Sequence, residues 1–123
     1  MRRYSRALEI LGAGSGDDAV SDEERLMLHL NLAMCNLKLG DNDSAVEDCD
    51  HALEIDSGNV KGLFRRGCAY LKLNNLEAAA ADLRKAQELD PTNAGVKKEL
   101  RALALQQKAA KEKEREMAAR MFG

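Results

Sequence analysis

The chain has 123 residues, a length typical of one compact domain. Hydrophobic residues make up 45% of it but aromatic residues only 3%, and Val, Ile and Thr are scarce beside Ala and Leu. Because β-branched and aromatic side chains build sheets, this composition excludes a sheet protein and predicts an all-α fold. The net charge of −2 gives no basic footprint for nucleic acid. No apolar run reaches the roughly 18 to 20 residues that cross a bilayer, so we expect no membrane segment.

The first 25 residues predict a helix followed by a loop. Residues 1–11, MRRYSRALEIL, begin basic and turn acidic at Glu9, without the apolar stretch of a secretory signal. We expect a short helix there. Residues 12–25 are rich in Gly, Ser and Asp, which predicts a flexible loop without a core of its own.

A repeat of 34 residues organises the middle of the chain, because residues 26–59 align with residues 60–93 without a gap. Nine positions are identical: Leu37/Leu71, Lys38/Lys72, Leu39/Leu73, Ala45/Ala79, Asp48/Asp82, Ala52/Ala86, Glu54/Glu88, Asp56/Asp90 and Asn59/Asn93. Residues 1–11 match the second half of this unit, with Ala7 at the position of Ala52. We therefore expect an incomplete first repeat that lacks its first helix.

Each full repeat predicts two helices joined by a turn. In the first, helices over about 26–39 and 43–55 flank Gly40-Asp41-Asn42, and in the second a helix over 60–73 precedes a break at Asn74-Asn75 and a helix that ends at Leu89. Small residues recur where helices must approach closely: Ala33/Gly67, Ala45/Ala79 and Ala52/Ala86. Residues 94–123 predict one long helix, whose Val96, Leu100 and Leu103 form a face that caps the last repeat. Its end, residues 108–120, alternates charges and predicts a solvated helix supported by i,i+4 Glu–Lys pairs.

No residue pattern indicates catalysis. The three cysteines, Cys35, Cys49 and Cys68, form no CxxC pair, so we expect buried free thiols in a reducing compartment. Cys49 and His51 are two apart on a predicted helix and do not share a face, and no metal-ligand spacing is present. Nucleotide-binding and nucleophile motifs are missing too. We therefore predict no catalytic residue, no cofactor and no metal.

A 34-residue helix-turn-helix unit with Gly67, Tyr70, Ala79, Ala86 and Pro91 in register resembles the tetratricopeptide repeat (TPR). More narrowly, LNLAMCNLKL, ALEIDSGNVKGLFRRGCAY and EMAARMF resemble the TPR domains of large immunophilin-type co-chaperones. These are the FKBP type, the forty-kilodalton-cyclophilin type and relatives of the aryl-hydrocarbon-receptor-interacting protein. The resemblance implies a right-handed α-solenoid of antiparallel helix pairs with a long C-terminal capping helix. It also implies a cytoplasmic protein with an upstream peptidyl-prolyl cis-trans isomerase domain, although this chain itself would not be an enzyme.

In such a solenoid the first helix of each pair lines a concave groove. The helical period then turns eight residues toward it: Met27, Asn31, Met34, Lys38, Lys61, Arg65, Cys68 and Lys72. This set is cationic although the chain is net acidic, which points to an extended anionic ligand. Lys61 and Arg65 stack one turn apart, and Asn31 holds the position of Arg65 in the preceding repeat. Two cations and an amide in that arrangement can hold a pair of carboxylates.

The resemblance assigns a ligand to this groove. Asn31, Lys61 and Arg65 match three of the five members of the carboxylate clamp that holds the C-terminal Glu-Glu-Val-Asp of heat-shock chaperones, of which we favour the ninety-kilodalton class. Lys38 matches a secondary groove lysine. The other two clamp members belong to the helix that the chain lacks, so we expect a weakened affinity. Phe64 would floor a pocket for the peptide's Val or pack in the core, and Met34 would line the groove or pack in the core.

Other interpretations stay open. In one, the chain is a TPR scaffold for a different protein partner. In the other it self-associates, because an unpaired first helix exposes apolar surface through which two copies can dimerise. Lys61 and Arg65 would be solvated charges in that case. The charged end of the last helix is either a solvated helix or, as the resemblance implies, a second contact with the chaperone.

Overall fold

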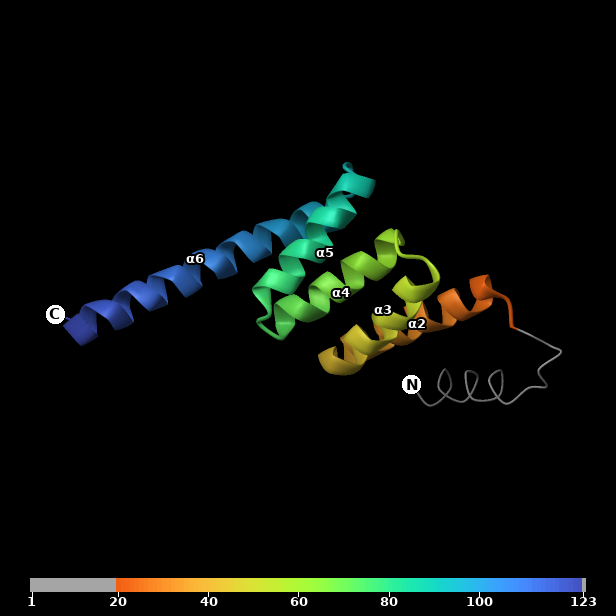
Figure 1. Cartoon of the computed structure of the whole chain (residues 1–123), viewed down its shortest axis with the longest axis horizontal. Helices are drawn as coiled ribbons and strands as arrows, with labels where there is room; N and C mark the ends of the chain where they lie inside the picture. The colour runs from red at the N-terminus through yellow and green to blue at the C-terminus, as the bar shows by residue number, and fades with distance from the viewer. Residues whose placement is uncertain (1–19, 123) are drawn as a thin grey trace.

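The computed structural model describes residues 20–122, and every regular element within them is an α-helix (Figure 1). The helices are α2 (Asp22–Leu39), α3 (Asn42–Ile55), α4 (Val60–Lys72), α5 (Leu76–Leu89) and α6 (Ala94–Phe122). The all-α prediction is thereby confirmed for this part of the chain. The helix expected over residues 1–11 and most of the loop expected over residues 12–25 lie outside the described residues.

The first described helix begins earlier than the sequence predicted. We expected a loop up to residue 25, but α2 starts at Asp22. Ser21 is its N-cap, and the Ser21 hydroxyl accepts a hydrogen bond of 3.2 Å from the backbone N–H of Glu24. Acidic side chains fill the first turn, where they interact favourably with the positive end of the helix dipole. The acidic run is therefore the start of the helix and not the end of the loop.

The turns within the two repeats lie at the positions that the sequence repeat predicted. Gly40 ends α2 with a φ of 78°, and its N–H donates to the carbonyls of Asn36 and Leu37. Asn74 takes the same position after α4 with a φ of 61° and is the one non-glycine residue of the described chain with a positive φ. Both residues tolerate the left-handed conformation, which ends a helix and reverses the chain.

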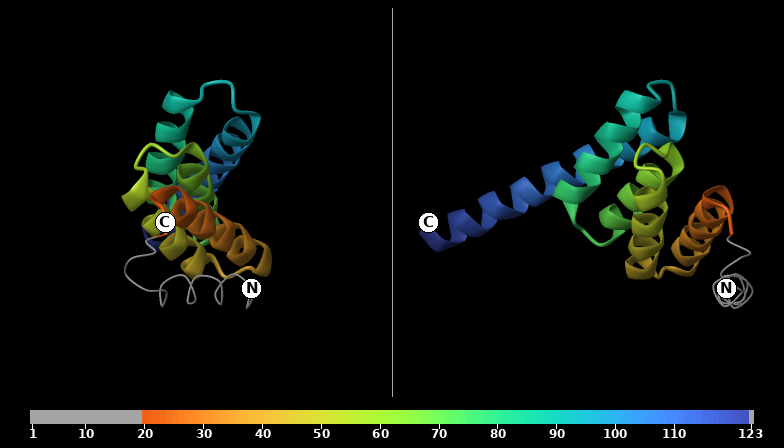
Figure 2. Two further views of the ribbon diagram at one scale, coloured as in Figure 1. Left: turned by 90° about the vertical axis from the view of Figure 1, so that its right-hand side faces the viewer. Right: turned by 45° about the vertical axis from the view of Figure 1, so that its right-hand side comes forward.

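Consecutive helices pack against one another in chain order, from α2 on α3 to α5 on α6. The first helices of the pairs also touch directly, α2 with α4 and α4 with α6, whereas α3 and α5 make no such contact. The surface made by α2, α4 and the start of α6, called here the A-helix face, is therefore the inner side of a curved stack. Figure 2 shows this stack from two further sides, with α6 projecting beyond the other helices.

Small residues bring the helices together, as the repeat predicted. Ala33, Ala45, Ala52, Ala79 and Ala86 are fully buried. The tightest approach lies between α4 and α5, where a Cβ atom added to Gly67 would lie 2.8 Å from the Leu83 side chain. This distance is well inside van der Waals contact, so the packing of these two helices depends on glycine at position 67.

The long helix α6 is held by its first half. Val96 and Leu103 are buried, and Leu100 packs on the same core, so the predicted capping face is confirmed. Beyond residue 107 every described side chain is exposed. Both ion pairs of residues 20–122 belong to Arg66, so the predicted Glu–Lys pairs of this helix are not formed. Solvated charges gain little from pairing, because water screens their attraction and holding two long side chains in place costs entropy.

None of the described helices combines the length and apolar character that crossing a membrane requires.

Candidate functional site

Arg65 connects the two full repeats on the A-helix face. Its Nη1 atom on α4 donates a hydrogen bond of 2.7 Å to the backbone carbonyl of Leu30 on α2. Leu30 precedes Asn31, so the bond brings the guanidinium to the turn of α2 that carries this asparagine. Asn31 and Arg65 are both half-buried. The Arg65 side chain thus reaches the part of α2 that carries Asn31; that the two side chains act together stays a prediction.

The Arg65 guanidinium keeps further donors for a ligand. Burial lowers its pKa and the nearby Cys49 thiol raises it, but an arginine remains charged at neutral pH. One N–H of the five in the guanidinium is directed at Leu30. The remaining donors suit a carboxylate, which the planar guanidinium can bind in a bidentate geometry.

Three other predicted residues are accessible on the same helices. Lys61 lies one turn before Arg65 on α4 and is exposed, and Lys38 is exposed in the last turn of α2. Met34 is 37% exposed. The described part of the A-helix face therefore offers cationic, amide and thioether groups to solvent. That they act together on one ligand stays a prediction.

Phe64 has a packing role. It lies against both groups of buried side chains, the one around Leu83 and the one around Val96. A Cβ atom built on Gly95 would be 3.3 Å from the tip of the Phe64 ring, so the ring fills the space between α4 and α6. The sequence left core packing open as one role for this residue, and the structure shows it. A contact of Phe64 with a peptide stays a prediction.

The cysteines are less uniformly buried than expected. Cys49 is buried, whereas Cys35 and Cys68 are intermediate. The correction has a structural reason: Cys68 stands on the A-helix face, where no outer helix covers it. Burial, and then Glu99, raise the pKa of Cys68 to about 12, although Lys72 lowers it. The thiol therefore stays protonated at neutral pH and is a poor nucleophile.

An ion-pair network centred on Arg66 of α4 was not predicted from the sequence. The Arg66 guanidinium donates to both carboxylate oxygens of Asp82 on α5, at 2.8 and 2.7 Å, and to Asp50 on α3 at 2.8 Å. Asp82 is only 5% exposed. One signal was available, because Asp48 and Asp82 are identical in the two repeats. Asp48 likewise accepts a hydrogen bond of 2.6 Å from the buried Asn36.

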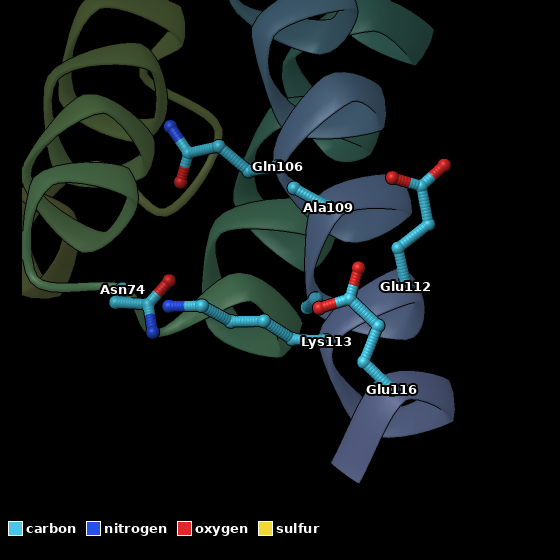
Figure 3. Close-up of a pocket in the computed structure, with 7 residues that line it drawn as sticks. Asn74, Gln106, Ala109, Glu112, Lys113 and Glu116 are labelled. Atoms are coloured by element: carbon cyan, nitrogen blue, oxygen red, sulfur yellow. The ribbon is translucent and has the colours of Figure 1, made fainter. Parts of the chain in front are cut away.

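A shallow hollow lies away from the predicted clamp residues. It has a volume of about 400 Å³ and lies between Asn74, after α4, and the exposed half of α6. Figure 3 shows Gln106, Lys113 and Glu116 on α6 around it, with the side chains of Asn74 and Lys113 directed toward each other. Amide and oppositely charged groups line the hollow together, so it has no single charge sign to offer a ligand.

Comparison with known proteins identifies the repeat. Two family models, each described as the tetratricopeptide repeat, match residues 28–59 and residues 60–93. The peptidyl-prolyl cis-trans isomerase FKBP4 of Bos taurus is 46% identical over 118 residues, which cover 94% of this chain and 25% of that protein. The chain thus spans about a quarter of this relative's length.

Solved structures agree with the sequence matches. The C-terminal TPR-containing domain of a Plasmodium falciparum FK506-binding protein aligns with a TM-score of 0.80 and 29% identity, over 89% of this chain and 76% of that one. The first TPR of RPAP3, bound to the HSP90 peptide SRMEEVD, aligns with a TM-score of 0.67 and 28% identity, over 84% of this chain and 79% of that one. The second TPR domain of human RPAP3, in complex with the HSP70 peptide SGPTIEEVD, aligns with a TM-score of 0.66 and 30% identity, over 83% of this chain and 82% of that one.

The repeat period, the helix pairs, the long capping helix and these matches agree. The expected solenoid fold and the immunophilin resemblance are confirmed: the chain belongs to the tetratricopeptide repeat family and is similar to the TPR domains of FKBP-type immunophilins.

Proposed function

We propose that this chain is the chaperone-binding module of a co-chaperone, and that its A-helix face holds the acidic C-terminal peptide of a heat-shock chaperone. The carrying observation is the hydrogen bond from Arg65 to the Leu30 carbonyl, which holds the guanidinium at the turn of α2 that carries Asn31. Lys61 precedes Arg65 by one turn of α4. Two cations and an amide then face one side of the stack. The RPAP3 domains bound to peptides that end in Glu-Glu-Val-Asp support this ligand class.

Each proposed clamp residue has a separate role. Arg65 binds a carboxylate with the donors that it does not direct at Leu30, Lys61 adds a mobile ammonium, and Asn31 donates its amide N–H. Lys38 and Met34 extend the binding surface along α2. We favour the ninety-kilodalton chaperone class.

The wider role follows the relatives. FKBP4 is named as a peptidyl-prolyl cis-trans isomerase, and this chain covers about a quarter of it. We propose that the same architecture holds here, with the isomerase activity in another domain of a cytoplasmic protein and none in the TPR chain. An isomerase assay on the 123-residue chain tests this point, and measurable turnover would contradict it.

The test of the ligand is calorimetric titration of the chain with SRMEEVD and with the same peptide amidated at its C-terminus. We expect saturable binding of the free acid and a loss of roughly tenfold or more on amidation, because a charge-assisted hydrogen bond contributes about 1.5 to 3 kcal/mol. Equal binding of both peptides would contradict the carboxylate clamp and favour a TPR scaffold for another partner.

Self-association through the first helix is the second candidate. Light scattering during size-exclusion chromatography tests it, and a monomer at every concentration would contradict it.

A further inference from the structure

The capping helix α6 continues the repeat register of α2 and α4. Asn59 caps α4 by accepting a hydrogen bond of 2.9 Å from the N–H of Gly62, and Asn93 accepts one of 3.1 Å from Val96 at the start of α6. Each of these asparagines also donates its side-chain amide to an aspartate three residues earlier. Because the two helices begin in the same way, their residues 34 apart occupy equivalent positions.

This register places Glu99 in line with the proposed clamp. Asn31 on α2, Arg65 on α4 and Glu99 on α6 are separated by 34 residues each. The first turn of α6 touches α4, where Gly95 meets the Phe64 ring. Glu99 is half-buried, one turn after that contact. The A-helix face therefore changes from an amide and a cation to an acid as it passes from α2 and α4 to α6.

The surroundings of Glu99 agree with this placement by the register. Burial, and then the charge of Glu99, raise the pKa of the Cys68 thiol on α4, while Lys72 lowers it. Within residues 20–122 neither ion pair involves Glu99. A half-buried carboxylate in this position repels acidic ligand residues and attracts basic ones.

We propose that Glu99 is a specificity-determining residue, which selects acidic C-terminal peptides that carry a basic side chain before their acidic residues. This inference rests on the proposed function. Packed helices lie about 8 to 10 Å apart, and an extended peptide rises about 3.3 Å per residue. A basic residue three to five positions before the terminus can therefore reach Glu99. The HSP90 peptide SRMEEVD carries such an arginine, and the HSP70 peptide SGPTIEEVD does not.

The experiment is a calorimetric cycle with two peptides, SRMEEVD and its arginine-to-alanine version SAMEEVD. The chain is used unchanged and as Glu99→Gln, with Glu114→Gln as the matched control on the exposed part of the same helix. We expect SAMEEVD to bind roughly two- to fivefold more weakly than SRMEEVD in the unchanged chain and in Glu114→Gln. In Glu99→Gln the two peptides should bind equally well.

The possible outcomes distinguish the role of Glu99 from the proposed function on which it rests. If SRMEEVD binds with a free-carboxylate requirement but its arginine dependence persists in Glu99→Gln, or is missing from the unchanged chain, the role of Glu99 is overturned and the clamp remains. If the unchanged chain binds neither peptide, the proposed function falls and this inference with it. Should Glu99→Gln fail to fold, Glu99→Lys replaces it and should reverse the preference, favouring SAMEEVD.

Discussion

The Nη1 atom of Arg65 lies 2.7 Å from the carbonyl oxygen of Leu30, across the junction of the two full repeats. This single bond does two things. It ties α4 to α2, and it orients a guanidinium at the turn of α2 that carries Asn31 before any ligand arrives. A side chain that is already ordered loses less entropy on binding, so the same residue links fold stability to ligand recognition.

Replacing Arg65 with lysine should separate charge from geometry. Arg65→Lys keeps the cation but loses the planar fork, so it cannot bind a carboxylate in a bidentate geometry while it bonds Leu30. We expect a small loss of stability, about 1 kcal/mol, and a loss of peptide affinity of roughly three- to tenfold. Denaturant unfolding and calorimetry measure the two effects. Unchanged affinity in Arg65→Lys would show that only charge matters.

The Arg66 network predicts that removing Arg66 destabilises the fold more than removing Asp50. Arg66→Ala removes both hydrogen bonds that Asp82 accepts from Arg66, and it leaves this carboxylate, 5% exposed, buried without its cation. We expect a loss of about 3 kcal/mol in the free energy of unfolding. Asp50→Ala, whose side chain is 48% exposed, should cost less than about 1 kcal/mol. Urea unfolding of both variants checks this order, and equal losses would contradict it.

Two glycines of α4 predict opposite tolerance to alanine. A Cβ atom at Gly67 would lie 2.8 Å from Leu83, which is fully buried and has no room to move, whereas at Gly62 it would lie 3.1 Å from the half-buried Leu53. Alanine gains about 1 kcal/mol of helix propensity at both sites. We expect Gly67→Ala to be destabilising by about 1 to 2 kcal/mol after this gain, and Gly62→Ala to be close to neutral. A thermal melt of the two variants tests the difference, and equal melting temperatures would contradict it.

A histidine pair predicts acid sensitivity. The rings of His29 on α2 and His51 on α3 stack with centroids 4.9 Å apart. Burial, then His51 and Arg25, lower the pKa of His29, although Glu54 raises it. The unfolded chain therefore takes up the proton first. The stabilising contribution is present above the ordinary histidine pKa, near 6.5, and is lost as the pH falls below it.

The free energy of unfolding measured between pH 7.5 and 5.5 checks this sign. It should decrease toward pH 5.5, and more steeply in the unchanged chain than in His29→Gln. The same slope in both chains would show that other groups cause the decrease.

Most of the fold could be predicted from the sequence, because the 34-residue period consists of local features. Caps, turns and small packing residues recur at fixed spacing, and Gly40 and Asn74 mark the turns by their backbone preference alone. The start of α2 was not predicted, because Ser21 caps a helix inside a segment whose composition resembles a loop. The contacts between repeats were not predicted either. The bond from Arg65 to Leu30 and the pairs of Arg66 join residues 16 to 35 positions apart, and no spacing rule within one helix predicts them.

Calorimetric titration of SRMEEVD into Lys61→Ala and Arg65→Ala tests the carboxylate clamp itself. Lys111→Ala and Arg84→Ala are matched exposed controls on other helices. The proposed clamp predicts that each of the first two variants binds roughly ten- to hundredfold more weakly than the unchanged chain, while the controls bind as the unchanged chain does. Full affinity in Arg65→Ala would contradict the clamp.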